Sequence, residues 1–291
     1  MPTVWGEKLV LRVLDTKGLD LQLRKLGFSE TNYERFAASF RKPHGMVLVT
    51  GPTGSGKSTT LYATLREIST PQINVITVED PVEYRLAGIN QVQVHPKAGV
   101  TFAAVLPAIL RSDPDVVMIG EIRDRATAQL AVEAALTGHL VLSTLHTNDA
   151  PSAATRLVEM GIEPFLVGSA LDCVLAQRLA RRLCEWCKEP YVPTEDDLRR
   201  WPPDAEIRPP ESLWRPVGCR NCGNTGFNGR VAVTEVMPVT ESVERLTLAR
   251  ASASEVRRTA LAEGMTSLRG DGLAKVADGQ TTLDEVIRVT V

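Results

Sequence analysis

The 291-residue sequence predicts an α/β fold: a mostly parallel sheet with helices on both faces, plus a small four-cysteine module and a helical C-terminal end. Three observations predict it. Short apolar runs alternate with segments of helical periodicity between residues 30 and 144, which is typical of a doubly wound sheet. A glycine-rich loop joins the first long apolar run to a helix. Two Cys-x-x-Cys pairs follow the last run.

Composition places the chain among soluble globular proteins, with 43% hydrophobic and 23% charged residues. A formal net charge of -2 gives no support for a polyanionic partner. No apolar run approaches the roughly 18 residues of a membrane span, and no signal peptide opens the chain. We therefore expect a cytoplasmic protein whose membrane contacts are made through partners.

The N-terminal stretch predicts one strand over residues 5–14, and a lone strand cannot bury its face. It either pairs with the main sheet or is the last strand of an upstream domain. A helix is expected over residues 30–40. We divide the chain into four parts: a strand remnant and linker (1–20), the main α/β domain (21–180), the cysteine module (181–235) and a helical subdomain (236–291).

The glycine-rich loop matches the P-loop pattern G-x-x-x-x-G-K-[ST] between an apolar strand over residues 46–50 and a helix over 59–68. This context argues against a chance glycine turn. Backbone N–H groups of such a loop surround phosphate oxygens, Lys57 reaches the β- and γ-phosphates, and the Ser58 hydroxyl ligates Mg²⁺. The predicted nucleotide-binding residues are Gly51, Pro52, Thr53, Gly54, Ser55, Gly56, Lys57, Ser58 and Thr59.

Acidic residues follow two further predicted strands. The strand over residues 73–78 leads into Glu79, Asp80 and Glu83, and α/β sheets bind ligands beyond the carboxyl ends of their strands. Glu83 is our candidate for the carboxylate that orients and deprotonates the attacking water, with a solvated acidic loop as the alternative.

The strand over residues 116–119 ends at Glu121, in the arrangement of a Walker B acid linked to Mg²⁺. Asp115 stands at the start of that strand and fits the role less well. A fourth strand, over residues 140–144, lies between His139 and His146. Each histidine is either a structural hydrogen-bonder or a sensor of the γ-phosphate.

Four segments, 51–58, 76–84, 110–124 and 137–150, resemble the Walker A, Asp-box, Walker B and His-box segments of the secretion ATPases. That family powers type II secretion, type IV pilus assembly and related DNA-uptake machines. The resemblance implies a RecA-like fold, ATP and Mg²⁺ as cofactors, and a water-activating Glu83. It also implies a magnesium-linked Glu121 and a nucleotide cleft lined by His139 and His146. Arg111 is carried over as a catalytic cation.

Two Cys-x-x-Cys knuckles predict a closed, structural zinc site with four thiolate ligands. The ligands are Cys184, Cys187, Cys219 and Cys222. Four buried free thiols are the alternative. The spacer is longer than that of common zinc ribbons and has a proline-rich middle, which suggests an excursion between the knuckles. Cys173 lies in an expected helical run over residues 165–178, where core packing is its expected use.

The cysteine module resembles that of the type II secretion and pilus-extension branch. Residues 225–237 resemble the strand pair, and residues 254–291 the helical end, of that branch. The resemblance implies an upstream domain of which this sequence holds only the last strand, so we expect a fragment, a trimmed chain or a shortened gene. Arg12 is the only match to that domain's phosphate-facing arginines, and Pro107 replaces another arginine. We therefore expect slow or negligible ATP hydrolysis by this chain alone.

Three functions remain open at this point. The first is a homohexameric ATPase motor that acts on an inner-membrane platform protein with a cytoplasmic docking protein, and contacts no nucleic acid. The second is a nucleic-acid motor that uses the knuckles with Arg178, Arg181 and Arg182, although the net charge of -2 argues against a DNA track. The third is a truncated ATP-binding protein with little turnover.

Overall fold

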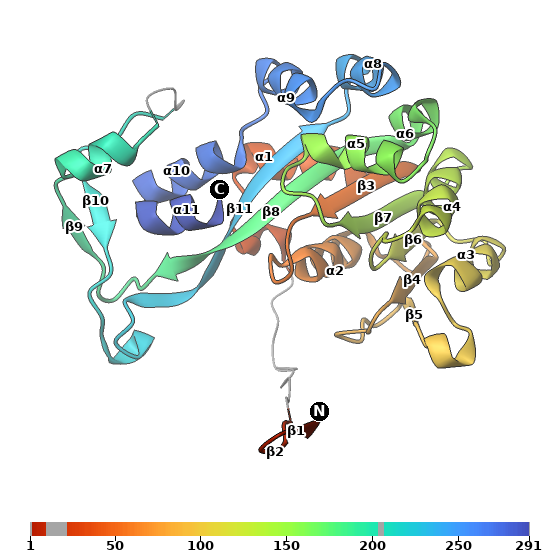
Figure 1. Ribbon diagram of the computed structural model, residues 1–291, viewed down its shortest axis with the longest axis horizontal. Coiled ribbons are helices and arrows are strands. Elements are labelled where there is room, and N and C mark those ends of the chain that lie inside the picture. Colours follow the sequence, from red (N-terminus) through yellow and green to blue (C-terminus); the bar gives the residue numbers. More distant parts are fainter. Residues whose placement is uncertain (1, 10–21, 203–206, 291) are drawn as a thin grey trace.

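The computed structural model describes residues 2–9, 22–202 and 207–290. Its centre is a seven-stranded sheet with the strand order β11-β8-β3-β7-β6-β4-β5 (Figure 1). Five of its strands run parallel to one another: β3 (Gly45–Thr50), β7 (Leu140–Leu145), β6 (Val116–Ile119), β4 (Val75–Glu79) and β5 (Asn90–Gln93). The first part of β8 also pairs parallel with β3. The mostly parallel α/β fold is confirmed.

Alternation along the strands divides the core into two layers. On β3, Met46 and Leu48 face one cluster, and Val47 and Val49 face the other. The first layer is covered by α3 (Phe102–Leu110), α4 (Arg125–Leu136), α5 (Pro151–Glu159) and α6 (Pro164–Ala170). The second is covered by α1 (Glu30–Phe40) and α2 (Lys57–Ile68), so helices cover both faces as expected.

The two longest strands are β8 (Leu171–Leu183) and β11 (Phe227–Pro238), which pair antiparallel and extend past the sheet (Figure 1). The helical run expected over 165–178 is therefore wrong, because α6 ends at Ala170 and a strand follows. This strand lies between β3 and β11 with both faces buried, so its side chains from 173 to 176 are all apolar and show no period of two. Cys173 is buried in it.

The strand pair expected over residues 225–237 is one strand, β11, with a register shift between Phe227 and Arg230. The expected domain boundaries after residues 180 and 235 fall inside β8 and β11. Both strands belong to the central sheet, so the cysteine module is an insertion between two neighbouring strands of that sheet.

The far end of the β8–β11 pair carries the cysteine module. It contains β9 (Glu189–Tyr191) paired with β10 (Leu213–Arg215), the helix α7 (Glu195–Arg200) and the 3-10 turn η3 (Arg220–Cys222). Trp201 and Leu213 pack on apolar residues of α10 (Leu268–Ala277) and α11 (Leu283–Val289). The remaining C-terminal helices, α8 (Glu241–Leu248) and α9 (Ala253–Ala262), lie against α6 and α5. The expected helical C-terminal end is confirmed.

At the N-terminus, β1 (Pro2–Thr3) pairs antiparallel with β2 (Gly6–Glu7) in a sheet of two strands. The strand expected over residues 5–14 is present only as Gly6–Glu7, and its later part, including Arg12, lies outside the described residues. The turn η1 (Leu23–Leu26) leads into α1. Within the described ranges, none of the helices combines the length and apolar character needed to cross a bilayer.

Candidate active site

The P-loop joins β3 to α2 and is held in place by Gln177 of β8. Gln177 Nε2 donates to Ser55 O at 2.8 Å, and Thr60 Oγ1 donates to Gln177 Oε1 at 2.7 Å. A Cβ at Gly51 would lie 2.5 Å from Gln177 O, and Gly56 has a φ of 88°. Side chains at these positions would push the loop away from β8, so the fit between loop and strand requires glycine.

Polar groups of this loop suit an anionic ligand. The Thr50 and Ser55 hydroxyl oxygens are buried and have no hydrogen-bond partner among the described residues. Lys57 Nζ donates to Gly51 O at 2.8 Å and to Pro52 O at 3.1 Å. Burial lowers the pKa of Lys57, and the Glu121 carboxylate opposes that shift. Unpaired donors, a lysine and the N-terminus of α2 together favour phosphate oxygens.

A cavity of about 820 Å³ lies over the carboxyl ends of β3, β4, β6 and β7. Its size is in the range of small-molecule sites. It brings together five predicted residues from four separate segments, namely Lys57, Ser58, Glu83, Glu121 and His146. This convergence follows from the parallel strands, whose carboxyl ends meet at one edge of the sheet.

Glu83 lies on the loop after β4, where Ser58 Oγ donates to Glu83 Oε1 at 3.5 Å. The loop is fixed by Tyr62 of α2, whose hydroxyl accepts from Glu83 N at 3.1 Å and donates to the Glu79 carboxylate. Glu79 is buried and also accepts from Thr77 Oγ1 at 2.5 Å. Burial, with the Glu79 carboxylate next in effect, raises the pKa of Tyr62, so the hydroxyl stays protonated and donates. Neither Tyr62 nor Glu79 was assigned a role from the sequence.

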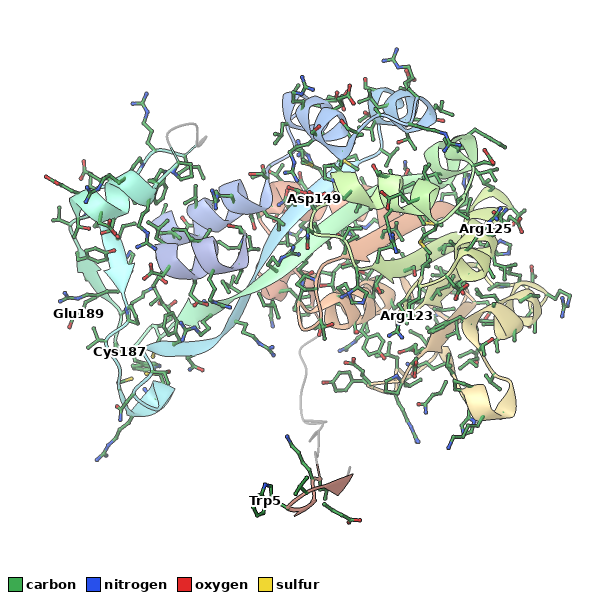
Figure 2. The ribbon with its side chains drawn as sticks, in the orientation of Figure 1. Trp5, Arg123, Arg125, Asp149, Cys187 and Glu189 are labelled. Carbon is green, nitrogen blue, oxygen red and sulfur yellow. The ribbon has the colours of Figure 1, made fainter. Side chains whose placement is uncertain are left out.

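Glu121 follows β6 and lies at the centre of a charged group in the cavity. Its Oε2 is 2.5 Å from Arg123 Nε and 3.7 Å from His146 Nε2. Figure 2 shows Arg123 on the segment that follows β6. Asp115 lies at the opposite end of the strand, where its carboxylate accepts from Asn74 N at 2.7 Å. Of the two acids, Glu121 is the one that lines the cavity.

The structure does not place His139 or Arg111 in the cavity. His139 precedes β7, and its O accepts from Gly45 N at 3.1 Å, where β3 also begins. The six strand residues between them, at about 3.3 Å per residue, place it roughly 23 Å from His146 along the strand. Its Nδ1 lies 3.0 Å from Ala134 O, which is a structural contact at the end of α4. Arg111 directly follows α3 at the same edge of the sheet and is exposed.

Two further cavity residues come from the antiparallel pair, Leu179 of β8 and Arg230 of β11. Neither was assigned a role from the sequence, because the helix expected over residues 165–178 hid the start of β8, and the strand pair expected over residues 225–237 was not placed beside the P-loop. Read as a strand, β8 directs alternate residues to one face, which puts Gln177 against the P-loop and Leu179 beside it. The apolar run over residues 173–176 was the available signal.

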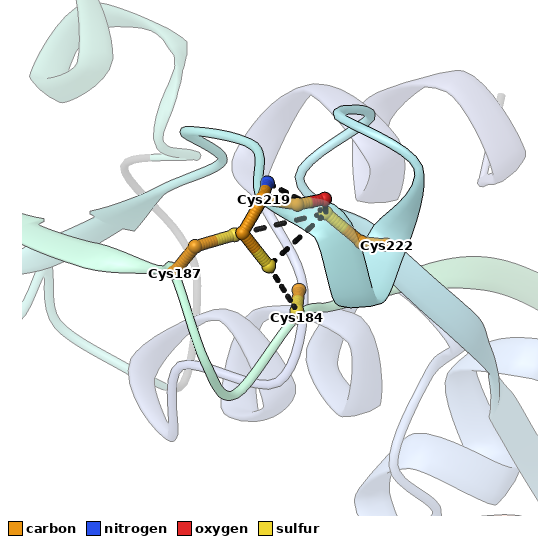
Figure 3. Close-up of side chains that lie close together, drawn as sticks. All are labelled: Cys184, Cys187, Cys219 and Cys222. Atoms are coloured by element: carbon orange, nitrogen blue, oxygen red, sulfur yellow. Dashed lines mark hydrogen bonds between the residues drawn. The ribbon is translucent and has the colours of Figure 1, made fainter.

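The four predicted zinc ligands converge at the end of β8 and β11 (Figure 3). All four sulfur atoms lie within 4.8 Å of one another, with 3.9 Å between those of Cys184 and Cys219 and 3.8 Å between those of Cys187 and Cys222. A tetrahedral zinc with Zn–S bonds of about 2.3 Å needs sulfurs about 3.8 Å apart. Burial opposes ionisation of Cys222, yet N–H groups of Cys219 and Gly226 lower its pKa to about 6. The donor set fits Zn²⁺.

The sheet, the loop and the acids beyond β4 and β6 define the class: this is a P-loop nucleotide-binding protein. Residues 1–288 match the family model of the type II/IV secretion system proteins, and the chain belongs to that family.

Two curated relatives are each 52% identical over 290 residues. One is the type IV pilus assembly ATPase PilB of Myxococcus xanthus, matched over 98% of this chain and 51% of its own. The other is the type II secretion system protein E of Aeromonas hydrophila, matched over 100% of this chain and 57% of its own. The chain thus spans about half the length of these relatives.

Among solved structures, the pilus retraction motor PilT with bound ADP superposes with a TM-score of 0.70. It is 26% identical, and the match covers 96% of this chain and 68% of that chain. The ATPase DotB of Legionella pneumophila superposes with a TM-score of 0.64 at 25% identity, over 92% of this chain and 64% of that chain. The arrangement of elements therefore resembles that of the pilus retraction motor PilT and the ATPase DotB.

Proposed function

We propose that this chain hydrolyses ATP at the cavity beside the P-loop and so drives type II protein secretion or type IV pilus assembly. The observation that carries the proposal is the single cavity that collects Lys57, Ser58, Glu83, Glu121 and His146. Of the two curated relatives described above, one is named as a type IV pilus assembly ATPase and the other as a type II secretion system protein. Because the chain spans about half of each, the activity and partners of the whole protein are part of the proposal.

The substrate phosphates would lie against the P-loop, where N–H groups and the Lys57 ammonium replace the water that normally solvates them. Mg²⁺, when bound, would neutralise developing charge on the β- and γ-phosphate oxygens. The residues available to hold it are Ser58, through its hydroxyl, and Glu121, directly or through water. Ser58 and Glu121 line the same cavity.

Glu83 would take the proton of the attacking water. Its carboxylate faces Ser58, and its backbone is fixed by Tyr62, so its position relative to the P-loop is defined before substrate binds. His146 reaches the cavity from β7 and lies next to Glu121, where it would respond to the presence of the γ-phosphate. Arg123 shares Glu121 with His146 and is a further cation within the cavity.

The motor would work as a homohexamer at the cytoplasmic side of the inner membrane, through a platform protein and a cytoplasmic docking protein. We expect a ring because, in motors of this kind, a neighbouring subunit supplies further positive charge to the phosphates bound by one chain. The relatives' names support both pilus assembly and secretion as the work performed. Pull-down of the platform protein from the source organism would distinguish these machines.

We propose that the four cysteines hold a structural zinc ion, because their sulfurs match the spacing of a tetrahedral site. With four protein ligands the site has no open position, so its role is to fold the module. A nucleic-acid motor has less support. Arg178 is buried, Arg181 Nη2 lies 2.8 Å from Glu285 Oε1, and Arg182 Nη2 lies 3.7 Å from Glu185 Oε1. Their charges are already paired within the chain or buried in it.

Two substitutions test the proposal. Lys57→Ala should weaken ATP binding about 100-fold, because a charge-assisted contact to the phosphates is lost. Glu83→Gln keeps the shape of the side chain and should bind ATP within about threefold of wild type, while single-turnover hydrolysis falls 100-fold or more. Glu34→Gln, on the exposed face of α1, is the control and should change neither quantity.

Unchanged turnover in Glu83→Gln would show that this carboxylate is not the base. Unchanged affinity in Lys57→Ala would place the nucleotide elsewhere. The same assay with added DNA or RNA tests the second function, since a nucleic-acid motor would show stimulated turnover with a steep salt dependence.

A further inference from the structure

The loop after β7 carries His146 and is anchored from outside the cavity. It runs from His146 to Ala150, where α5 begins. Three contacts fix it. Arg178 Nη2 donates to Asn148 O at 2.7 Å, Arg257 Nη2 donates to Asp149 Oδ2 at 2.5 Å, and Ala150 N donates to Glu235 Oε1 at 2.8 Å. Figure 2 shows Asp149 close to the start of α5.

Arg257 makes one of these contacts and also pairs with Glu235, the acceptor in another. Besides Asp149, its Nη1 lies 3.5 Å from Glu235 Oε2. Glu235 comes from β11 and is almost fully buried, with a side chain 1% exposed. A buried carboxylate needs donors and a cation to remain ionised. Burial raises the pKa of Glu235, and the N–H of Ala150 and the Arg257 guanidinium oppose the shift.

Arg257 lies on α9, a C-terminal helix that contributes nothing to the lining of the nucleotide cavity. Its side chain is 35% exposed, so the helix places the guanidinium at the boundary between solvent and the loop. We propose that Arg257 is a positioning residue: it bridges Asp149 and Glu235 and thereby holds His146 against Glu121. This inference rests on the proposed function, in which His146 responds to the γ-phosphate.

The contacts predict a specific pattern of failure. Loss of Arg257 removes the cation paired with both Asp149 and Glu235, although Asp149 still accepts from Ser152 N and Glu235 from Ala150 N and Leu268 N. Two of the three loop anchors should therefore weaken together. The P-loop is held separately by Gln177 and does not depend on them. ATP affinity should therefore persist while turnover falls, because displacement of a catalytic group by about 1 Å can cost 100-fold in rate.

The test compares Arg257→Met and Arg257→Lys with Arg258→Met. Arg258 is the next residue of α9, is exposed, and serves as the matched control. Arg257→Met should lower turnover at least tenfold with ATP affinity within threefold, and Arg257→Lys should recover part of the loss. Arg258→Met should match wild type. Equal turnover in Arg257→Met and wild type would overturn the proposal.

A readout that does not require hydrolysis separates this inference from the proposed function. The chain has four histidines, so the imidazole signals of ¹⁵N-labelled protein can be assigned with a His146→Asn variant. Arg257→Met should shift the His146 signal and leave the other three unchanged, whether or not the wild-type chain turns over. A His146 signal identical to wild type would overturn the positioning role even where hydrolysis is confirmed.

Should Arg257→Met fail to fold, Asp149→Asn gives the same test, because the amide keeps the size of the side chain and removes its charge. It should shift the His146 signal in the same direction. A double-mutant cycle with Arg257→Lys should show non-additive effects on turnover, as expected for two residues in one ion pair. Additive effects would contradict a shared action on the loop.

Discussion

Replacement of Tyr62 by phenylalanine removes one hydroxyl that two parts of the site share. The hydroxyl donates to the buried Glu79 carboxylate and accepts from Glu83 N at 3.1 Å. A hydrogen bond to a charged group contributes about 1.5–3 kcal/mol, and the half-buried N–H adds less. Glu79 keeps its donors Thr77 and Gln91. We therefore expect the free energy of unfolding to fall by about 2–3 kcal/mol.

For a chain of this size, that loss corresponds to a decrease of roughly 4–10 °C in Tm. Turnover should also fall, since the loop that carries Glu83 loses its contact with α2, while ATP affinity changes little. Tyr84→Phe is the matched control, because the change keeps the ring that packs edge-on against Tyr62, and within the described part of the chain no hydrogen bond of the Tyr84 hydroxyl is seen. A Tyr62→Phe variant with the Tm and turnover of wild type would refute the reasoning.

Three further predictions concern other parts of the molecule. His146→Ala should lower ATP turnover tenfold or more, and His139→Ala should leave it within twofold of wild type in the same assay. The reason is that of these two histidines only His146 lines the cavity. Equal losses in both variants would contradict this placement. Cys219→Ser should weaken zinc binding at least tenfold and speed hydrogen exchange in residues 184–226 while the central strands stay protected, and a purified chain without zinc would refute the site. Burial alone would raise the pKa of Glu285, but hydrogen bonds from Arg288 and Arg181 lower it from 4.5 to about 2. The stabilisation that the ionised Glu285 gives to the folded chain is therefore present above pH ~4.5 and is lost as the pH falls towards about 2. Glu285→Gln should lower the free energy of unfolding by on the order of 1–2 kcal/mol at neutral pH, measured by urea unfolding. It should also reduce the loss of stability between about pH 4.5 and pH 2. A variant that loses as much stability as wild type over this pH range would disprove this account.

The central strands and most of the cavity could be predicted because each depends on local pattern and on one rule of topology. The apolar run before Gly51 and the helix after Ser58 are local features. The meeting of Glu83, Glu121 and His146 follows from parallel strands that end at one edge. That same rule shows why His139 was misplaced: a residue before a strand lies at the opposite edge, and the strand direction was already implied by the sequence.

The part that could not be predicted depends on long-range contacts. Nothing local distinguishes Glu79, which is buried and bonded to Tyr62, from Glu83, which faces the cavity, because both stand at the carboxyl end of the same strand. The β8 segment was assigned to a helix because a strand buried on both faces has no alternation. Its role in holding the P-loop through Gln177 followed only from its position between β3 and β11.

The β8–β11 pair has a mechanical consequence. One antiparallel ladder passes the P-loop, where Gln177 lies opposite Thr234, and reaches the cysteine module, where Leu183 lies opposite Phe227. Its single register shift lies between Phe227 and Arg230, and Arg230 also lines the nucleotide cavity. If the strands were to tilt beside the P-loop, the displacement would be largest at the cysteine module, because that module lies at the far end of the ladder.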